Sequence, residues 1–421
     1  MITLYNILQF LLLSILFLPL AIFVILVPKY RLRTLRRLGF GLSYVRKSGG
    51  KKTLWIHALS VGEVTSALPL VSGLRKKMPD VQLVFSASSR AGARVAEHLL
   101  HDKVDCFIPF PLDILPVINR FVNVIQPDLF ILVETDFWPN ILAVLRRRNI
   151  PTLLVNGRIS TKSMRSYQRL AFFFRPLFSS FQALSMQTGK DRENLILLGV
   201  DKRQIHTFGN LKYDTDLYNA SGPMSRLSFN LPEHQLLLVA GSTHKGEEKI
   251  LLQSYKKLKK EIPGLYLIIA PRDVDRGTEL QALASTMELM ANCRSHINAG
   301  GKDLFILDTI GELSSLYSHA DLAFIGGSLV PAGGHNPIEP AVVGVPVLYG
   351  PHMEDFSEIS EELVQAGGAT MVHSGDELTA AVLRLLQDNP LRKKAGGAAR
   401  ACIVRQQGVI DRHLKLINEM L

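Results

Sequence analysis

The sequence predicts an α/β protein built from two parallel-sheet domains in series. From residue 53 onward, short apolar runs alternate with longer stretches of helical pattern, which is typical of parallel strands linked by helices. The polar, turn-rich segment 218–235 divides this alternation into two series. An apolar segment ahead of the first series predicts a separate N-terminal helix.

The N-terminal apolar segment predicts a single-pass membrane anchor. Residues 8–27 contain only Gln9 and Ser14 as polar side chains. Twenty helical residues span about 30 Å, the thickness of a bilayer core. The alternative is a cleaved signal peptide, but no basic residue precedes Lys29 and no small-residue cleavage site follows the apolar run. Because basic residues favour the cytoplasmic side, we expect residue 29 onward to lie in the cytoplasm.

The net charge of +11 is concentrated beside this segment. Residues 1–52 hold nine of the 48 lysines and arginines and no acidic residue. The rest of the chain has 39 basic against 37 acidic residues, a net charge of only +2. A nearly neutral body lacks the basic face expected of a nucleic-acid-binding domain, so nucleic acid is not an expected partner. A basic neck instead fits an anionic membrane surface.

The apolar runs define the expected strands and domains. The strands of the first domain are expected at 53–59, 81–87, 104–110, 129–134, 152–156 and 183–187, and those of the second at 236–241, 265–270, 304–308, 322–326 and 345–349. This pattern predicts an anchor over 1–28, a basic neck over 29–52, a first Rossmann-like domain over 53–217, a linker over 218–235 and a second Rossmann-like domain over 236–421. The last helix is expected to pack back on the first domain. Ligands of open parallel sheets bind beyond the carboxyl ends of the strands, so the loops that follow the strands are the places to search.

Four loops of the first domain carry polar side chains directly after expected strands: 60–64, 86–92, 134–140 and 156–160. We expect Glu63, Glu134, Asp136 and Arg158 to converge at one edge of the sheet and to face a cleft between the domains. Taken singly, each acid is equally well explained as a helix-capping or solvated carboxylate.

The second domain offers a loop at 241–248 that follows a strand and opens a helix. Ser242 or Thr243 is expected to cap this helix, whose free N–H groups would suit a phosphate, and Lys245 would add a positive charge. An ordinary capped helix explains the same residues. The sequence has neither a GxGxxG fingerprint nor a P-loop, which removes the main support for a dehydrogenase or a P-loop NTPase.

The stretch 326–340, with the sequence GGSLVPAGGHNPIEP, is more specific. Its two glycine pairs, the second ending at Gly334, would let the backbone approach a ligand closely. Asn336 is expected to cap a helix that starts at Pro337, and Glu339 lies one turn in, where it could accept hydrogen bonds from ribose hydroxyls. His335 has no second ligand at helical spacing other than Glu339, so no metal site is expected.

Two further residues follow a strand of the second domain. Gly311 and Glu312 lie in the stretch DTIGELSSLY, residues 308–317. They could contact a base or a ribose, or simply start a helix. Cys106, Cys293 and Cys402 lie far apart and form no CxxC pair, which argues against a disulfide framework or a zinc site.

Together these motifs resemble the 3-deoxy-D-manno-oct-2-ulosonic acid (Kdo) transferases of lipopolysaccharide assembly. The resemblance covers nearly the whole chain and keeps the order and spacing of many motifs. These are SVGEV (60–64), ETDFWPN (134–140), NGRIS (156–160), GNLKYD (209–214), GSTHKGEE (241–248), APR (270–272), DTIGEL (308–313), GGSLVPAGGHNPIEP (326–340) and GVPVLYGP (344–351).

The resemblance implies a membrane-anchored, inverting glycosyltransferase of the GT-B fold that needs no metal or other cofactor. Such an enzyme transfers Kdo from CMP-Kdo to lipid IVA, the tetraacyl lipid A precursor, at the cytoplasmic face of the inner membrane. The expected partners are therefore CMP-Kdo, lipid IVA and the anionic membrane surface.

The resemblance also implies roles for single residues. Glu63 corresponds to the family acid regarded as the catalytic base, and Glu134 to the acid of the ETDFWPN motif. The nucleotide loops of the family correspond to these residues: Pro271, Arg272, Gly311, Glu312, Asn336 and Glu339.

The chain departs from the family pattern at two places. Asp273 replaces a usual histidine in PRDVDR, while Arg272 and Arg276 remain. The stretch SASSRAG, residues 86–92, replaces a threonine-rich motif and keeps hydroxyls that include Ser88, an expected acceptor-side residue. The acceptor contacts of this chain are therefore expected to differ from those of the family.

Three other functions fit parts of the sequence. Another membrane-associated GT-B glycosyltransferase with a different nucleotide sugar is the nearest alternative. A sugar-nucleotide epimerase of the same fold has no need of an anchor or a basic neck. A membrane-tethered nucleotide-binding protein without catalysis leaves Glu63, Glu134 and Arg158 unexplained.

Overall fold

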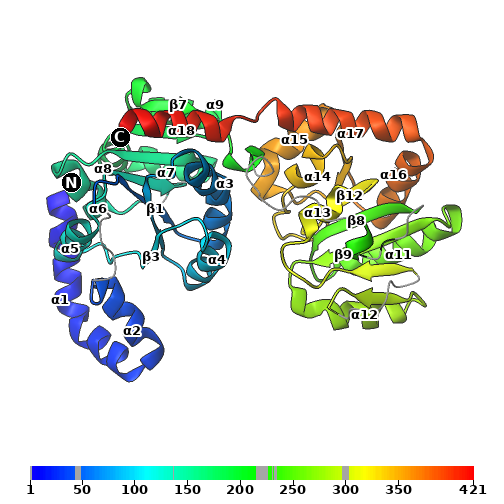
Figure 1. Cartoon of the computed structure of the whole chain (residues 1–421), viewed down its shortest axis with the longest axis horizontal. Helices are drawn as coiled ribbons and strands as arrows, with labels where there is room; N and C mark the ends of the chain where they lie inside the picture. Colours follow the sequence, from blue (N-terminus) through cyan, green and yellow to red (C-terminus); the bar gives the residue numbers. More distant parts are fainter. Residues whose placement is uncertain are drawn as a thin grey trace. The chain divides into compact units, whose positions relative to one another are not determined.

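The protein folds into two compact units. The computed structural model describes residues 2–42, 49–135, 137–214, 226–229, 231, 235–295 and 303–421. Unit 1 comprises Met1–Tyr218 and Gly408–Leu421, and unit 2 comprises Asn219–Gln407. Each unit is a parallel sheet with flanking helices (Figure 1).

The described residues of unit 1 form one sheet of seven parallel strands in the order β3-β2-β1-β4-β5-β6-β7. The strands are β1 (Thr53–Ala58), β2 (Gln82–Ala87), β3 (Cys106–Pro109), β4 (Leu129–Val133), β5 (Thr152–Gly157), β6 (Ala183–Met186) and β7 (Ile205–Thr207). All residues of β1, β2, β4, β5 and β6 are buried, so helices cover both faces of the central sheet. This burial explains why these strands are continuous apolar runs instead of alternating ones.

Helices link the strands of unit 1. They are α1 (Ile2–Leu26), α2 (Pro28–Arg37), α3 (Val61–Lys77), α4 (Arg90–Leu100), α5 (Leu115–Ile125), α6 (Pro139–Arg147), α7 (Thr161–Arg169), α8 (Ala171–Phe178), α9 (Gly189–Leu197) and α18 (Val409–Met420), with 3₁₀ turns η2 (Lys202–Gln204) and η3 (Leu211–Asp214). The core under α5, α6 and α8 contains Trp55, Phe121, Phe130, Phe178 and Phe181, each no more than 1% exposed.

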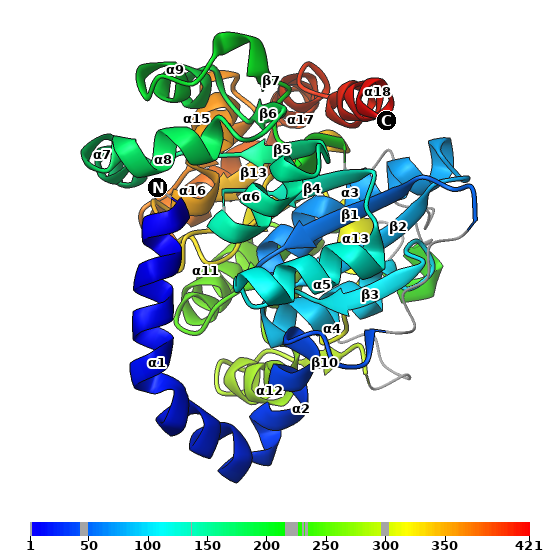
Figure 2. The same ribbon diagram turned by 90° about the vertical axis from the view of Figure 1, so that its left-hand side faces the viewer.

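The N-terminal half of α1 is hydrogen-bonded to the body of unit 1. The Tyr5 hydroxyl donates to Asp113 Oδ2 at 3.1 Å, and the Asn6 amide donates to Asn140 Oδ1 at 2.9 Å. Gln9 Nε2 donates to the Asp113 carbonyl at 2.9 Å. Figures 1 and 2 both show this end of α1 beside α6. Three polar side chains near the start of α1 therefore attach this helix to the rest of unit 1.

In the part of the chain that the structure describes, no helix is both long enough and apolar enough to cross a membrane.

Unit 2 repeats the architecture. Its described residues form seven parallel strands in the order β10-β11-β9-β8-β12-β13-β14. These are β8 (Leu236–Thr243), β9 (Leu265–Pro271), β10 (Ala291–Cys293), β11 (Leu304–Ile306), β12 (Leu322–Ile325), β13 (Val347–Tyr349) and β14 (Ala369–Met371). The helices are α11 (Glu247–Glu261), α12 (Gly277–Ser285), α13 (Leu313–Tyr317), α14 (Ile338–Val342), α15 (Ser357–Gln365), α16 (Gly375–Gln387) and α17 (Asn389–Val404), with 3₁₀ turns η4 (Arg226–Phe229), η5 (Val274–Arg276) and η6 (Glu354–Phe356).

The expected strands are present, and three further short strands accompany them. β7, β10 and β14 were not predicted, and all three lie at sheet edges. An edge strand has only one neighbouring strand and is less deeply buried, so its sequence needs no apolar run. The expected linker, 218–235, lies mostly outside the described residues.

In each sheet the first strand of the unit lies beside a strand from later in the chain, so that the connections on its two sides run in opposite directions. In unit 1 this switch point lies between β1 and β4, and in unit 2 it lies between β8 and β12. Ligands of open parallel sheets bind at the carboxyl ends of the strands that flank such a point. The loops after these four strands are therefore the candidate site.

The C-terminal helix α18 packs on unit 1 beside α3 (Figure 1). The fully buried carboxylate of Asp214 accepts hydrogen bonds from Gly408 N at 2.9 Å and Ile410 N at 2.6 Å. Lys77 and Asp411 also form an ion pair at 2.5 Å, but both side chains are exposed. The buried carboxylate is therefore expected to hold α18 more strongly than the surface pair does.

We expect Asp214→Ala to lower the free energy of unfolding by about 2–3 kcal/mol, because two N–H groups lose their acceptor. Hydrogen exchange across residues 408–421 should accelerate in this variant. The matched control, Asp411→Ala, should cost only about 0–1 kcal/mol. Equal effects of the two variants would contradict this account of how α18 is attached.

Candidate active site

Glu63 lies at the switch point of unit 1, in the first turn of α3 after β1. Its Oε2 accepts a hydrogen bond from Leu59 N at 2.5 Å, and its Oε1 accepts one from the Ser60 hydroxyl at 3.2 Å. Ser60 is the N-cap residue, and its hydroxyl lies 3.4 Å from Glu63 N. This arrangement resembles a capping box, so Glu63 organises the loop that carries it. The residue is buried, with 9% of its surface exposed.

Glu134 lies on the other side of the switch point, immediately after β4. Its backbone has the left-handed φ of +62°, which is uncommon for a residue with a side chain. Asn156 Nδ2, at the end of β5, donates to Glu134 Oε1 at 3.3 Å, and the Ser66 hydroxyl of α3 lies beside the same carboxylate. Burial raises the pKa of Glu134, and the nearby Lys212 charge partly opposes this. A carboxyl group with a raised pKa suits proton transfer.

The structure places the other first-domain candidates as follows. Arg158 follows β5 and is exposed. Its positive charge lies close enough to Glu134 to oppose part of the rise in the pKa of that carboxyl group. Its carbonyl accepts a hydrogen bond from the Thr135 hydroxyl at 3.0 Å. Asp136 lies outside the described residues. Glu63, Glu134 and Arg158 thus follow strands β1, β4 and β5 at the same edge of the sheet.

Ser88 belongs to a buried network centred on His57. The imidazole is fully buried, with Nδ1 3.0 Å from the Ser86 hydroxyl and Nε2 3.3 Å from the Ser88 hydroxyl. Burial lowers the pKa of His57 to about 3, so the ring is neutral. The ring also stacks on Phe110 with centroids 3.5 Å apart. The Ser88 hydroxyl therefore has a structural partner, and His57 fixes the start of the SASSRAG loop.

In unit 2, the loop after β8 does not form the expected capped helix start. Ser242 and Thr243 are the last residues of β8, and α11 begins only at Glu247, with Gly246 at its N-cap. Neither hydroxyl caps α11, so that prediction is wrong. The reason is that strand pairing continues through Thr243 to Pro271, and Gly246, with φ +107°, makes the turn into the helix.

The side chain of Glu247 joins the two loops of the second switch point. Its carboxylate accepts hydrogen bonds from His244 N at 2.6 Å, Gly327 N at 2.6 Å and Leu329 N at 3.4 Å. The residue is fully buried, and this burial raises its pKa to about 7. The His244 N–H group of the loop after β8 is therefore bonded to protein and is not available to a phosphate.

His335, expected at the nucleotide site, contacts His244 directly. The two Nε2 atoms are 2.8 Å apart, and the rings stack with centroids 5.1 Å apart. One Nε2 atom must donate an N–H group and the other must accept it, so the two Nε2 atoms are not both protonated in this contact. Burial lowers the pKa of His244, and the Arg272 charge nearby lowers it further. The pair connects the loop after β8 to the loop after β12.

The glycines of stretch 326–340 make room for protein. A Cβ on Gly326 would lie 2.3 Å from the Ser242 carbonyl oxygen, and one on Gly334 would lie 2.4 Å from Met353 Sδ. Gly334 also has a left-handed φ of +73°. At these two glycines the backbone thus lies close to neighbouring segments of unit 2, which leave no room for a side chain.

The remaining second-domain candidates surround this switch point. Pro271 ends β9, and Arg272 N donates to the Thr243 carbonyl at 2.9 Å. Lys245 is exposed and lies 3.8 Å from Glu279. The cationic groups of Lys245 and Arg272 thus belong to the loops after β8 and β9, two neighbouring strands of the sheet.

Asn336 and Glu339 lie at the start of α14. Asn336 Oδ1 accepts from Ile338 N at 3.1 Å, and its amide donates to Glu339 Oε1 at 3.0 Å. The N-cap residue of α14 is Pro337 and the helix begins at Ile338, so the expected cap at Asn336 is wrong by one residue, although Asn336 still accepts the Ile338 N–H group. Gly311, with φ +93°, precedes Glu312, whose carboxylate pairs with Arg294 at 2.9 Å. Glu312 therefore has a structural partner, which favours the helix-start interpretation over a ribose contact.

Asp273, where the chain departs from the family histidine, caps a 3₁₀ turn. Its carboxylate accepts from Asp275 N at 3.2 Å. Arg276 is bonded to Glu248 at 2.6 Å and to Glu279 at 3.2 Å. Among the described side chains, no group of three or more histidines, cysteines and carboxylates is arranged to hold a metal.

Comparison with known proteins shows the family. The sequence model described as 3-deoxy-D-manno-octulosonic-acid transferase (kdotransferase) matches residues 33–215. The 3-deoxy-D-manno-octulosonic acid transferase of Haemophilus influenzae is 33% identical over 402 residues, covering 94% of this chain and 92% of that protein. This chain belongs to the Kdo transferase family. It is therefore a glycosyltransferase of lipopolysaccharide biosynthesis.

Solved structures show the same two-domain α/β fold. A glycosyltransferase from Rickettsia africae matches with a TM-score of 0.58 and 12% identity, over 88% of this chain and 99% of that one. A UDP-GlcNAc 2-epimerase from Neisseria meningitidis matches with a TM-score of 0.57 and 15% identity, over 84% and 99%. At these identities the matches show the GT-B-like fold alone, and the assignment to the Kdo transferases comes from sequence.

Sequence reasoning missed four residues that shape the site of this Kdo transferase: His57, Asn156, Lys212 and Glu247. Asn156, Lys212 and Glu247 lie within the motifs named above, and His57 lies three residues before SVGEV, but each has a partner far away in the sequence. A buried polar residue in an apolar strand is the signal that could have indicated His57, because such a group needs a specific partner.

We predict that Glu247 makes the stability of unit 2 depend on pH. Its folded-state pKa of about 7 lies above the ordinary 4.5, so its stabilising contribution is complete below pH 4.5 and is lost as pH rises through 7. Urea unfolding across this range should show the wild type losing about 2–3 kcal/mol relative to Glu247→Gln, which stays neutral. Glu261→Gln, at the exposed end of α11, is the control. Parallel pH profiles for wild type and Glu247→Gln would contradict the prediction.

Proposed function

We propose that the chain transfers Kdo from CMP-Kdo to lipid IVA with inversion, using Glu63 as the general base. Membership of the Kdo transferase family supports the donor and acceptor classes. The position of Glu63 carries the proposal for the base, since this carboxylate lies at the carboxyl end of β1, beside the switch point of unit 1.

The acceptor hydroxyl is neutral and must lose its proton as it attacks the anomeric carbon. A carboxylate held in a fixed orientation can accept that proton. The bonds from Leu59 N and the Ser60 hydroxyl supply such an orientation for Glu63. Inversion requires one displacement and therefore one base, through an oxocarbenium-like transition state. Glu134 and Arg158 would then act on the acceptor side.

Unit 2 would bind the CMP group of the donor at the loops after β8, β9 and β12. The departing phosphate gains negative charge, which cationic side chains can stabilise. Lys245 and Arg272 are the cations that these loops provide. The His244–His335 pair offers a further hydrogen bond, whereas Glu312 is already paired with Arg294.

We also propose that residues 1–28 attach the enzyme to the inner membrane, with the catalytic units on the cytoplasmic face. The apolar sequence of 8–27 and the basic residues that follow support this assignment. Exposed apolar side chains on α1, such as Phe10 at 71% and Ile15 at 75% exposure, fit contact with lipid.

Glu63→Gln should reduce the kcat of Kdo transfer by about 10²–10⁴-fold, because the amide cannot accept the proton. The amide oxygen can still accept the Leu59 N–H bond, so the fold should be retained. The assay follows labelled Kdo from CMP-Kdo to lipid IVA, with product mass giving the number of Kdo units added.

Ser60→Ala is the matched control for the loop. It removes the capping hydroxyl at a cost of about 1 kcal/mol in stability and leaves the carboxylate in place. We expect most of the turnover to remain. Near-normal turnover in Glu63→Gln would refute the assignment of the base, and equal losses in both variants would show that Glu63 acts only through the loop. Preference for another nucleotide sugar over CMP-Kdo would refute the proposed donor.

The proposed mechanism uses no metal ion, because cationic side chains serve the departing phosphate. We therefore expect transfer to persist at its full rate after dialysis against EDTA, measured in the same assay. Loss of turnover that returns on adding Mg²⁺ would contradict this proposal.

A further inference from the structure

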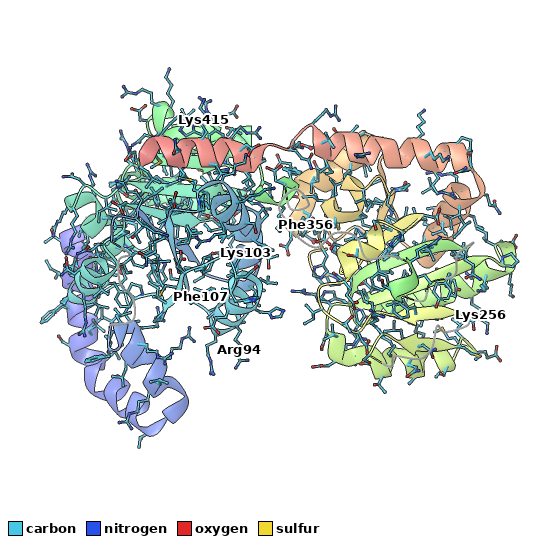
Figure 3. All side chains as sticks on the ribbon, in the orientation of Figure 1. Arg94, Lys103, Phe107, Lys256, Phe356 and Lys415 are labelled. Carbon is cyan, nitrogen blue, oxygen red and sulfur yellow. The ribbon has the colours of Figure 1, made fainter. Side chains whose placement is uncertain are left out.

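A cavity of about 450 Å³ lies in unit 1 between α2 and α4, above the ends of β2 and β3. The SASSRAG stretch contributes Ala87, Ser89 and Arg90 to its lining. Its walls include Arg33 and Arg36 of α2 together with Arg90 and Arg94 of α4. Figure 3 labels two of the lining residues: Arg94 on α4, which is charged, and Phe107 on β3, which is apolar.

The inner wall of the cavity is apolar. Phe85 and Ile108 are buried there, and Phe107 lies edge-on to Phe85 with ring centroids 6.4 Å apart. Leu32 of α2 lines the same cavity and is 62% exposed. A wall of this kind favours hydrocarbon over water.

The rim of the cavity carries a strong positive charge. Four arginines face one acid, Glu97. Arg33 donates a hydrogen bond to the Ser88 carbonyl. Within the described residues, neither an ion pair nor a hydrogen bond engages the guanidinium groups of Arg36, Arg90 or Arg94. Gathering like charges is unfavourable unless an anion compensates them, and arginine binds phosphate oxygens through two parallel bonds.

The cavity adjoins the loop of the proposed base. Ser89 lines the cavity, and its N–H donates to the Leu59 carbonyl at 2.9 Å. Leu59 N in turn donates to Glu63 Oε2 at 2.5 Å. Gly92 of α4 packs closely on Ser60, since a Cβ at this position would lie 3.3 Å from the Ser60 carbonyl carbon. A ligand in the cavity therefore lies beside the loop that carries Glu63.

We infer that this cavity binds the phosphorylated, acylated part of the acceptor, with an acyl chain on the apolar wall and a phosphate monoester on the arginines. The inference rests on the proposed function, because it takes the acceptor to be an acylated sugar phosphate. It deepens that proposal by naming the groups that hold the acceptor. A bilayer phospholipid has the same chemistry, but the connection to the Glu63 loop favours the acceptor.

The test compares two double variants of the full-length chain. Arg90→Gln/Arg94→Gln removes two cavity charges spaced four residues apart on α4. Arg165→Gln/Arg169→Gln removes two exposed charges with the same spacing on α7, also in unit 1. Both change the net charge equally, so differences between them report on position.

In neutral detergent, the α4 variant should raise the KM for the phosphorylated acceptor by about tenfold or more. The KM for CMP-Kdo and the kcat should stay within about twofold of the wild type, because neither the donor loops nor Glu63 is altered. With the dephosphorylated, fully acylated acceptor, wild type and α4 variant should have the same KM. The α7 variant should behave as wild type throughout.

Two results would overturn the inference. The first is an unchanged acceptor KM in the α4 variant; if binding to phosphatidylglycerol vesicles were lost in the same variant, the cavity would be assigned to bilayer lipid. The second is an equal rise in KM for the phosphorylated and the dephosphorylated acceptor.

Direct binding of the phosphorylated acceptor to Glu63→Gln, with and without the α4 substitutions, separates this inference from the proposed function. Phosphate-dependent binding that needs Arg90 and Arg94 would support the cavity even if no turnover were observed. If the enzyme transfers Kdo but binds the phosphorylated acceptor equally well with and without the α4 substitutions, the inference about the cavity is refuted while the proposed function stands.

Discussion

Buried carboxylates that accept backbone N–H groups hold loops and helix starts in both units. Removing a carboxylate from water is costly unless hydrogen bonds replace its hydration. Asp113, Asp191 and Asp214 in unit 1 and Glu247 in unit 2 all find such donors on segments distant in sequence. Burial raises the pKa of each of the four, so desolvation exceeds the compensation from hydrogen bonding. The loops at the switch points are fixed by this balance.

Burial and hydrogen bonding also distinguish Glu247, a structural carboxylate, from Glu63, the proposed base. Glu247 accepts three backbone N–H groups and is fully buried, so its oxygens are committed to the protein. Glu63 accepts one backbone N–H group and one hydroxyl, and it stays 9% exposed at the edge of the sheet. A base must be oriented and yet reachable, and the hydrogen bonds and the residual exposure of Glu63 fit the role proposed for it. Capping and catalysis are therefore compatible roles of this side chain, since the bonds that cap the helix also aim the carboxylate.

The sequence was most informative where burial alone determines structure. The central strands are buried on both faces, so their apolar runs indicated them directly, whereas the edge strands β7, β10 and β14 left no such signal. The switch points could not be placed, because strand order is a property of the folded sheet. Once the order is known, it explains why residues after β1 and β4, and after β8 and β12, gather in pairs.

The site was less predictable because local rules competed with distant partners. Ser242 and Thr243 had the composition of helix caps, but strand pairing extended to Thr243, and the carboxylate of Glu247 accepted the His244 N–H group of the loop. Glu312 could be placed after a strand, but its ion pair with Arg294 joins segments that only the fold brings together. Periodicity and motif position record neighbours along the chain, whereas these partners are neighbours in space.

The polar contacts of α1 connect the N-terminal segment to the candidate site. Asp113 accepts hydrogen bonds from Tyr5 and also from Asn140 N and Ile141 N, at the start of the helix that follows the loop of Glu134. One buried carboxylate thus fastens both α1 and the end of that loop. Exposing the polar groups of Tyr5 and Gln9 to lipid would be energetically unfavourable. In this structure both side chains form hydrogen bonds to protein, and the exposed side chains of the helix are apolar. If residues 1–28 hold the enzyme at the membrane as proposed, then Asp113 joins the membrane-attached helix to the end of the loop that carries Glu134.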